Sequence, residues 1–189
     1  MFGLGTTLRS AKILLDFANE DIKGNILDLG AKDCSLGQRL INPRIKYIPI
    51  DIKFEDTYPW DVIEADLNCG IPFESNYFDY VFASMVIEHV FNPINLLREI
   101  KRVLKPEGIC IIALPNEDSL ISKLSYLWDD CDSIEEQYYG HHWRFTFKNA
   151  KELLEKSGFE ILDYSGRFGV TSKKLISIAP CILFKVRKK

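Results

Sequence analysis

The sequence predicts an α/β protein built on a mostly parallel sheet, and three observations support this fold class. Short apolar runs typical of strands alternate along the chain with amphipathic helical patterns. Two of these runs, FDYVFASMVI and ICIIALPN, are apolar almost throughout, as expected for strands that are buried on both faces. The 189 residues, with 47% hydrophobic and 27% charged side chains, suit a single domain with a substantial core. Strands that alternate with helices favour a sheet with helices on both faces.

The first half of the chain predicts a helix followed by a series of strands. Apolar side chains recur at steps of three and four between Leu8 and Ile22, which predicts an amphipathic helix that Gly24 ends. A glycine turn follows the first apolar run and leads into a second predicted helix, near Leu36 to Ile41. Apolar runs predict five strands, at residues 25–29, 46–52, 60–67, 78–87 and 109–116.

The clearest helix signal lies between the fourth and fifth predicted strands. Asn92 can cap this helix, and Pro93 suits its first turn. Pro106 and Gly108 are expected to end it. Its buried face is predicted to consist of Ile94, Leu97, Ile100, Val103 and Leu104.

The C-terminal third predicts one more helix and two final strands. Thr146 is a plausible N-cap, and Gly158 a plausible end, for a helix in TFKNAKELLEKSGF. The runs EILDYSGRF and CILFKVRK predict the strands. Residues 117–145 are less regular, with a mixture of acidic and aromatic side chains. The sequence contains no repeat or linker, so residues 1–189 are expected to form one domain that begins with a helical segment at residues 1–23.

The composition argues against several classes of protein. A net charge of −3 disfavours a general nucleic-acid binder, because such proteins usually carry a basic excess. No apolar run reaches the roughly 20 residues of a membrane span, and no signal peptide is expected. Five cysteines without a CxxC pair indicate neither a disulfide framework nor a zinc site, so we expect a cytoplasmic, reduced protein. Cys110 and Cys181 are expected to be core residues.

Polar residues stand at the predicted carboxyl ends of the strands, where ligands bind in open α/β sheets. They are Asp28 and Gly30 after the first strand, Asp51 after the second, Asp66, Leu67 and Asn68 after the third, Ser84, Glu88 and His89 after the fourth, and Pro115 and Asn116 after the fifth.

Two of these acidic residues suit an adenosine ligand. Asp51 lies 21 positions after Gly30, where an acidic side chain can accept hydrogen bonds from both ribose hydroxyls. Asp66 and the backbone N–H of Leu67 could pair with the adenine ring. An ordinary turn or capping aspartate remains the alternative at both positions.

Asp28 helps to distinguish between two adenosine cofactors. A carboxylate two residues before Gly30 would repel a pyrophosphate but would suit an ammonium group, which favours S-adenosylmethionine over NAD. Lys32 and Cys34 stand where further glycines are usual in dinucleotide folds. A side chain at Lys32 is tolerable there if it points to solvent. Since a non-glycine residue at positive φ costs about 1 kcal/mol, we expect the loop to take a modified path.

Four stretches carry a recognisable order of motifs: ILDLGAKDCSLG, YIPIDI, the long segment from ADLNCGIPF to ICIIALPN, and HHWRFTFKNAKELLEKSGFEILDY. Together they resemble the class I S-adenosylmethionine-dependent methyltransferases, and most closely the small-molecule and glycan branch called methyltransferase type 11. The resemblance implies a Rossmann-like three-layer sandwich with a seven-stranded, mostly parallel sheet whose last strand is antiparallel. It also implies S-adenosylmethionine as the cofactor. The loop departs from the family at Lys32 and Cys34.

The resemblance also implies which residues contact the cofactor and the acceptor. Asp28 and Gly30 would hold the methionine end, Asp51 the ribose, and Asp66 with Leu67 the adenine, while Ser84 lies close by. Residues 117–145 would form a lid insert on the acceptor side, in which Trp128, Tyr138 and Tyr139 could pack on an acceptor.

Methyl transfer requires alignment of the acceptor, and a base only if the acceptor must lose a proton. His89, His141 and His142 are candidate bases or acceptor contacts, because the pKa of histidine lies near neutrality, although each could instead be structural. We expect no metal site from these histidines, since their spacing gives no shared helical face. The basic end of CILFKVRKK allows at most a weak peripheral membrane contact, and a final strand explains it equally well.

Three hypotheses follow from the sequence. The first is an active methyltransferase that acts on a small-molecule or glycan- or lipid-linked acceptor, with no nucleic-acid partner. The second is an S-adenosylmethionine-binding scaffold with weak or no activity, which Lys32 and Cys34 keep open. The third is an NAD-dependent oxidoreductase, which Asp28 and the missing GxGxxG disfavour.

Overall fold

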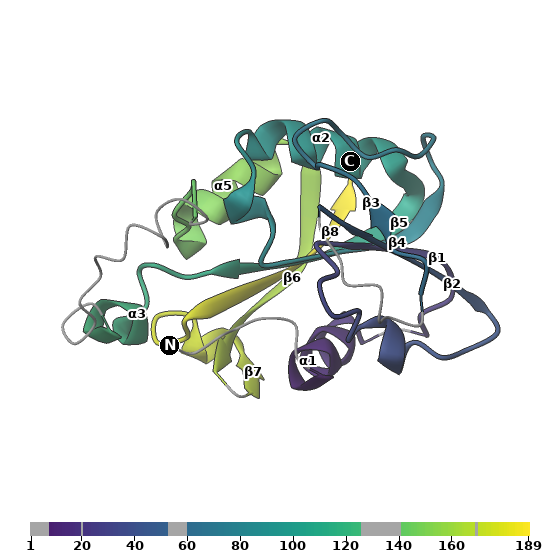
Figure 1. The fold of residues 1–189 in the computed structure, drawn as a ribbon. Helices are drawn as coiled ribbons and strands as arrows, with labels where there is room; N and C mark the ends of the chain where they lie inside the picture. The colour runs from purple at the N-terminus through teal and green to yellow at the C-terminus, as the bar shows by residue number, and fades with distance from the viewer. Residues whose placement is uncertain (1–7, 20, 53–59, 126–140, 169) are drawn as a thin grey trace.

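The computed structural model describes residues 8–19, 21–52, 60–125, 141–168 and 170–189, which form a central sheet with helices on both faces (Figure 1). The strands are β1 (Gly24–Leu29), β2 (Ile45–Asp51), β3 (Ile63–Glu64), β4 (Phe78–Ser84), β5 (Leu104–Pro115), β6 (Phe159–Phe168), β7 (Val170–Ser172) and β8 (Cys181–Lys188). The helices are α1 (Leu8–Ala18), α2 (Pro93–Val103), α3 (Leu120–Ser125) and α5 (Phe147–Lys156), with 3-10 turns η1 (Gly37–Arg39), η2 (Ile87–His89) and η3 (Lys173–Leu175).

The sheet has the order β3-β2-β1-β4-β5-β8-β6-β7. Neighbouring strands from β3 to β5 are parallel, whereas β8 is antiparallel to both β5 and β6. The predicted mostly parallel, seven-stranded sheet with an antiparallel last strand is therefore confirmed. The three-residue β7, antiparallel to β6, adds an eighth strand that the sequence analysis did not predict.

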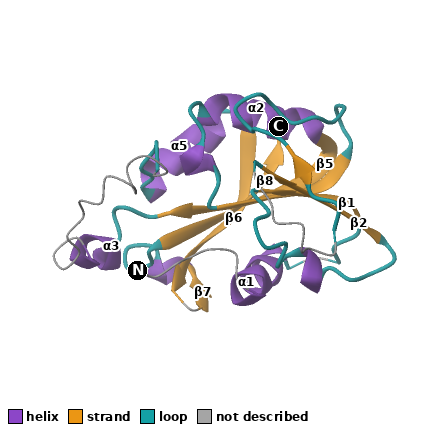
Figure 2. Cartoon of the chain, viewed as in Figure 1, coloured by secondary structure: helices purple, strands orange, loops and turns teal. Residues whose placement is uncertain are grey.

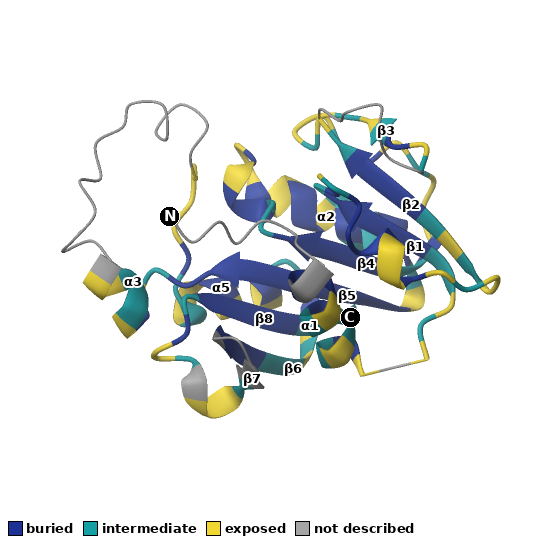
Figure 3. Cartoon of the chain, turned by 60° about the horizontal axis from the view of Figure 1, so that its bottom comes forward, coloured by how far each residue is buried: buried dark blue, intermediate teal, exposed yellow. Residues whose placement is uncertain are grey.

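Two apolar clusters hold the helices against opposite faces of the sheet (Figure 2). Alternate residues of β1 divide between them, since side chains of a strand point to opposite faces in turn. Leu27 and Leu29 belong to the cluster that α2 and α5 cover, and Ile26 belongs to the one that α1 covers. The central strands are almost entirely buried (Figure 3), which explains their near-continuous apolar sequences.

Two boundaries near the N-terminal side differ from the prediction. Helix α1 ends at Ala18 and not near Gly24, because Asn19 takes a left-handed conformation (φ 48) and donates its backbone N–H to the Leu15 carbonyl. The predicted helix near Leu36 to Ile41 is only the 3-10 turn η1. Gly37 is poor in a helix interior and is used here to approach the Tyr47 ring closely.

Helix α2 is confirmed, with Asn92 accepting a hydrogen bond from the backbone N–H of Asn95 at 3.1 Å. Its C-terminal end and one buried position were predicted wrongly. Ile94 is 44% exposed, and Leu96 is buried in its place. The helix stops at Val103 because Leu104 already pairs with β4, so the predicted stop residues Pro106 and Gly108 lie within β5.

The predictions for the C-terminal third are largely confirmed. Thr146 and Asn149 form a reciprocal capping box at the start of α5, and Gly158 follows the helix at φ 83. Cys110 and Cys181 are fully buried, and burial raises the pKa of both thiols. Among the described residues, no helix is both long and apolar enough to cross a bilayer.

Candidate cofactor and acceptor site

The candidate site lies where the strand order of the sheet reverses. β2 and β3 extend from one side of β1, and β4 and β5 extend from the other. All these strands run in one direction, so their carboxyl ends meet at one edge of the sheet. In open α/β sheets this edge is where ligands bind.

The turn after β1 has the left-handed backbone conformations that are typical of a glycine-rich loop, although most of its residues are not glycine. Gly30, Lys32 and Cys34 have φ values of 66, 46 and 51. The expected modified path, with the left-handed region avoided, is therefore wrong. Contacts hold the conformation in place: the Lys32 backbone N–H donates to Asp51 at 2.8 Å, and the buried Cys34 packs beside Ala31. Lys32 itself is exposed, which meets the condition for a side chain at this position.

Gly30 is needed at its position for two reasons. Its positive φ favours glycine, and a Cβ there would lie 2.9 Å from the Cγ2 of Val86. Its N–H donates to the Ile50 carbonyl at 2.9 Å. The turn thus touches both the end of β2 and the segment after β4.

Asp28 lies buried at the end of β1, with an exposed fraction of 3%. Its Oδ2 accepts a hydrogen bond from the Tyr47 hydroxyl at 2.6 Å. Burial raises the pKa of this carboxyl to about 7, against the lowering effect of the Tyr47 hydrogen bond, and the nearby charges of Asp33 and Asp51 raise it further. Three carboxyl groups therefore lie within electrostatic range at the turn, an arrangement that suits a cationic ligand and opposes a pyrophosphate.

Asp51 ends β2 and holds the turn. Its Oδ2 accepts the Lys32 N–H, and its Oδ1 accepts the N–H of Ile52 at 2.7 Å. Its own carbonyl accepts a hydrogen bond from the Ala65 N–H at 3.0 Å, at the end of β3. The residue therefore joins three strand ends, and a ribose contact at its carboxylate stays a prediction.

Asp66 forms the turn that the sequence analysis left open as an alternative. Its Oδ1 accepts from the backbone N–H and from the side-chain amide of Asn68, both at 2.9 Å. Leu67, which stands between Asp66 and Asn68 in the sequence, packs against the core. The Asn68 Oδ1 in turn accepts the Phe91 N–H at 2.8 Å, which ties this turn to the segment after β4.

The segment after β4 carries the acceptor-side candidates. Ser84 is buried at the end of the strand, and Met85 follows with φ 55. The chain then enters η2, which places Glu88 inward and His89 outward.

Residues His141–Trp143, which we call the HHW segment, are bound to this same stretch of chain. The backbone N–H groups of His142 and Trp143 both donate to the Glu88 carbonyl, at 2.8 and 3.2 Å. The Trp143 Nε1 lies 3.1 Å from the Val90 carbonyl oxygen and 3.3 Å from that of Phe91. These contacts bring together two segments that are more than 50 residues apart in sequence.

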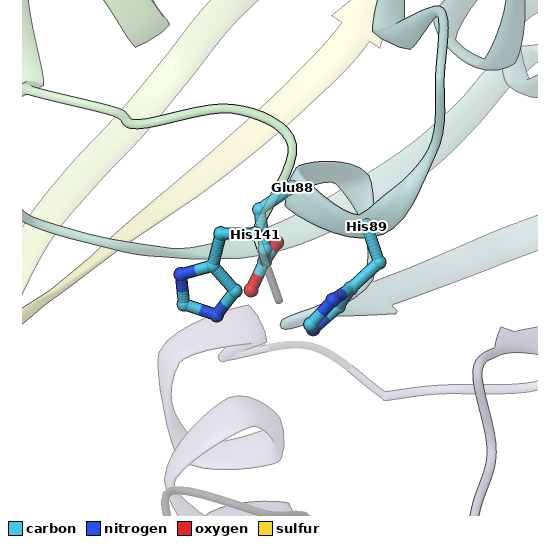
Figure 4. Close-up of side chains that lie close together, drawn as sticks. All are labelled: Glu88, His89 and His141. Atoms are coloured by element: carbon cyan, nitrogen blue, oxygen red, sulfur yellow. The ribbon is translucent and has the colours of Figure 1, made fainter. Parts of the chain in front are cut away.

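Two of the three predicted histidines lie together, and the third does not. The His89 and His141 rings meet edge to face with centroids 4.9 Å apart. One ring nitrogen of each histidine and one carboxylate oxygen of Glu88 all lie within 4.8 Å of one another (Figure 4). His142 turns away and packs on Phe91, with ring centroids 4.8 Å apart.

Glu88 was noted at this strand end but not predicted as a site residue. Its exposed fraction is 0%, and burial raises the pKa of its carboxyl to about 8. Neither carboxylate oxygen has a hydrogen-bond partner among the described residues. A buried carboxyl without a partner is costly, which marks Glu88 as a site residue.

Two more buried polar atoms without a partner among the described residues lie at this edge. They are Oδ1 of Asn116, just after β5, and Nη1 of Arg167, near the end of β6. The nitrogen atoms Nη2 of Arg167 and Nδ2 of Asn116 make hydrogen bonds within the protein. Arg167 Nη2 donates to the Ser10 hydroxyl, and Asn116 Nδ2 donates to the Ala179 carbonyl. Unsatisfied polar atoms thus gather where an acceptor is expected.

Sequence reasoning missed Tyr47, Asp33 and Glu88. Tyr47 and Asp33 act on Asp28 through a cross-strand contact and a turn, which no local pattern indicates. The signal that could have identified Glu88 was its place beside His89 at a strand end.

Some predicted features cannot be placed. Trp128, Tyr138 and Tyr139 of the expected lid insert lie outside the described residues. Two basic side chains of the C-terminal run have partners within the protein: Arg187 pairs with Glu160, and Lys188 donates a hydrogen bond to Asn76.

The site residues fit S-adenosylmethionine better than a dinucleotide. The buried acidic group at Asp28 would face a cationic ligand favourably, and the exposed Lys32 leaves the turn unobstructed by its side chain. Asp51 and the turn at Asp66 stand at successive strand ends along the same edge.

Comparisons with known proteins agree with this geometry. A family model described as "Methyltransferase domain" matches residues 7–164. The bifunctional biotin-biosynthesis protein BioHC of Cellvibrio japonicus is 30% identical over 105 residues, which are 53% of this chain and 20% of that protein. The chain spans less than half the length of each of the curated relatives it matches, at 23%, 20% and 42%.

Solved structures share the fold at low identity. A Thermotoga maritima protein described as a possible histamine N-methyltransferase superposes with a TM-score of 0.67 at 15% identity, covering 96% of this chain and 92% of that one. The [4+2]-cyclase SpnF has a TM-score of 0.69 at 16% identity, covering 96% of this chain and 80% of that one. These likenesses establish the fold alone.

Proposed function

Because this chain belongs to the methyltransferase domain family, we propose that it transfers a methyl group from S-adenosylmethionine to a polar small-molecule or glycan- or lipid-linked acceptor. The family and the fold imply S-adenosylmethionine as the cofactor, which when bound supplies an electrophilic methyl group on a positively charged sulfur. The protein's own contribution is to hold the two reactants in line and to exclude water. Such positioning can lower a barrier by roughly 7–11 kcal/mol.

The observation that carries this proposal is the acidic turn at the point where the strand order reverses. The charges of Asp33 and Asp51 both raise the pKa of the buried Asp28, at a sheet edge that otherwise buries apolar side chains. A cation bound there would relieve this repulsion, whereas the phosphates of NAD would add to it. The acidic turn therefore counts against the oxidoreductase alternative.

Each cofactor-side residue has a proposed task. Asp28 favours the positively charged methionine end from beneath the turn, and Gly30 lets the backbone approach. Asp51 accepts hydrogen bonds from the ribose hydroxyls while it keeps the turn in shape. Asp66 and Leu67 border the adenine, and Ser84 closes the site on the β4 side. These tasks are supported by the position of all these residues at or just beyond the carboxyl ends of neighbouring parallel strands, which meet at one edge of the sheet.

On the acceptor side, Glu88, His89 and His141 are proposed to contact the acceptor and to accept its proton where one must leave. The free lone pairs of Glu88 and Asn116, and the unpaired N–H of Arg167, favour a polar acceptor over an apolar one, as far as the described residues go. His142 is proposed to be structural, because its ring packs on Phe91.

Binding experiments separate the three hypotheses. In a calorimetric titration, S-adenosylmethionine and S-adenosylhomocysteine are expected to bind with one site per chain, and NAD is not. At a free concentration 100 times the Kd, the cofactor should stabilise the fold by about 2.7 kcal/mol, visible as a raised Tm. Binding of NAD alone would remove the methyltransferase assignment.

Turnover distinguishes an active enzyme from a silent scaffold. Transfer of label from methyl-labelled S-adenosylmethionine is expected with polar small molecules or lipid-linked glycans in an acceptor panel. The scaffold alternative rested on Lys32 and Cys34, and its support is weaker now that Lys32 is exposed and both residues keep glycine-like φ values. Cofactor binding without transfer to either class of acceptor would restore it.

A further inference from the structure

We propose that Glu88, His89 and His141 form a binding site for one divalent transition-metal ion, with Zn²⁺ as the best match. This goes beyond the proposed methyl transfer, which requires no metal. It also reverses the expectation drawn from the spacing of the three histidines, because the third ligand is Glu88 and not His142.

The first support is geometric. One potential ligand atom from each residue lies within 4.8 Å of the others. Ligands at about 2.1 Å from a tetrahedral Zn²⁺ stand about 3.4 Å apart, so the separations must close by up to about 1.4 Å. His89 and His141 are exposed side chains, and modest rotations about their χ angles can supply this movement without repacking the core.

The second support is the state of the Glu88 carboxylate. It is fully buried, has no hydrogen-bond partner among the described residues, and lies between the two imidazoles (Figure 4). Buried carboxylates are normally paired with a cation or hydrogen-bonded. A metal ion held by the two histidines would give this group the partner that it lacks.

The third support is the rigidity of the framework around the cluster. The backbone carbonyl of Glu88 accepts the N–H groups of His142 and Trp143, which fixes His141 next to η2. The Trp143 indole binds the carbonyls just beyond His89. Metal sites depend on this kind of supporting contact to hold their ligands at a defined separation.

The ligand types indicate which ion would bind. Two imidazoles and one carboxylate suit Zn²⁺ and related transition ions, whereas Mg²⁺ and Ca²⁺ prefer oxygen ligands. Three protein ligands leave at least one coordination position for a group from outside the cluster. That this group is an acceptor oxygen depends on the proposed function, but metal binding itself does not.

The test uses the full chain after treatment with a chelator and dialysis. Zn²⁺ should bind with one ion per folded chain, and a large excess of Mg²⁺ should not displace it. Co²⁺ should occupy the same site and give an absorption spectrum without thiolate charge-transfer bands. Failure of wild-type protein to bind Zn²⁺ stoichiometrically would overturn the proposal.

Variants locate the site. H89Q, H141Q and E88Q should each lower the Zn²⁺ affinity at least tenfold, which is about 1.4 kcal/mol. H142Q is the matched control, since it changes the neighbouring histidine outside the cluster, and C69S controls for binding at an exposed thiol. Both controls should keep the wild-type affinity. A loss with H142Q or C69S equal to that with H89Q would disprove this ligand set.

The result can be separated from that of the methyl-transfer proposal. Each variant is first checked for a wild-type circular dichroism spectrum and for S-adenosylmethionine binding, which H89Q and H141Q should leave intact. If Zn²⁺ binds but S-adenosylmethionine does not, the metal site stands and the proposed function fails. The reverse outcome removes only the metal site.

Discussion

Asp28 is buried and lies near the carboxylates of Asp33 and Asp51. Its protonation state should therefore change when a cationic ligand binds. Its pKa of about 7 means that neutral and ionised forms coexist near physiological pH. Desolvation is the largest cause, and the Tyr47 hydroxyl limits the rise by stabilising the carboxylate. A cationic ligand favours the ionised form further.

We expect S-adenosylmethionine affinity to rise as the pH increases towards 7 and to level off above it. The bound cation lowers the pKa of Asp28, so binding below pH 7 must release a proton from this carboxyl. Calorimetry in buffers of different ionisation enthalpy measures that release directly. Asp28→Asn should flatten the pH profile, and Tyr47→Phe should move the rise to higher pH. A profile unchanged in both variants would contradict this role.

The same carboxyl should make the ligand-free protein less stable at high pH. Its folded pKa of about 7 lies above the usual value of 3.8, so the folded chain binds more protons than the unfolded chain between these pH values. The stabilisation of the folded chain by this bound proton is fully present below pH 4. It is lost as the pH rises through 7. Asp28→Asn should therefore gain stability relative to wild type at pH 8 but not at pH 4, measured by urea unfolding.

Asp51→Ala should weaken S-adenosylmethionine binding at least tenfold, about 1.4 kcal/mol. The substitution removes the proposed ribose contact and also the acceptor of the Lys32 N–H. Glu107→Ala makes the same charge change at an exposed position at the start of β5, the opposite edge of the sheet, and should have no effect. Equal affinities for Asp51→Ala and wild type, measured by calorimetry, would show that the ribose assignment is wrong.

Lys32→Gly should stabilise the fold by about 1 kcal/mol, because glycine adopts φ 46 without the steric cost of a side chain. Lys32→Ala removes the same charge but keeps that cost, so it should give no comparable gain. Denaturant unfolding of the two variants compares these effects. If alanine and glycine stabilise equally, charge and not backbone strain is the cause.

Residue spacing predicted part of the site and missed the rest for a definite reason. Asp28, Asp51 and Asp66 could be found because they stand at strand ends that topology brings to one edge. The burial of Glu88 could not be predicted, because the 3-10 turn that carries it is bonded to the HHW segment from distant sequence. The left-handed turn at Lys32 was missed because hydrogen bonding to Asp51 offsets a cost that local sequence alone predicts.

At the scale of elements, hydrogen bonds join the HHW segment to the segment after β4. Trp143→Phe keeps an aromatic ring but removes the N–H that bonds the carbonyls of Val90 and Phe91. We expect a loss of about 1–2 kcal/mol. Hydrogen exchange at the His142 and Trp143 amides should accelerate, since local opening becomes easier.

His142→Gln is the control for this prediction, because it leaves the backbone N–H groups and the indole in place. Its amide protection should stay near that of wild type. Equal acceleration in both variants would show that the ring of His142, and not the Trp143 hydrogen bonds, holds the segment.

Element types were predicted better than element ends. The helices α2 and α5 could be recognised from their caps and their apolar faces, and both caps are confirmed. The predicted helix near Leu36 failed because Gly37 packs on Tyr47 from the next strand. The end of α2 was placed too late, since the strand pairing of Leu104 overrides the local stop signals.

At the scale of the whole molecule, Phe184 connects the antiparallel strand to a helix layer. It is fully buried in β8, and its ring stacks on Phe147 of α5 with centroids 5.7 Å apart. Phe184→Ala should cost about 3–5 kcal/mol in unfolding free energy. Leu162→Ala, at a 39% exposed position of β6, should cost less than about 0.5 kcal/mol, as urea unfolding would report. A loss for Phe184→Ala as small as that for Leu162→Ala would mean that β8 contributes little to the common core.

The position of β8 also has a consequence for biosynthesis. Among the described strands, β6 joins β5 and the parallel strands through β8 alone, although residues 159–168 leave the ribosome before residues 181–188 do. Until β8 emerges, β5 and β6 both present an unpaired backbone edge, and such edges invite association with other nascent chains. The sheet is therefore complete only once the eight residues of β8 have inserted between β5 and β6. A chaperone that shields those two strand edges would act before this insertion.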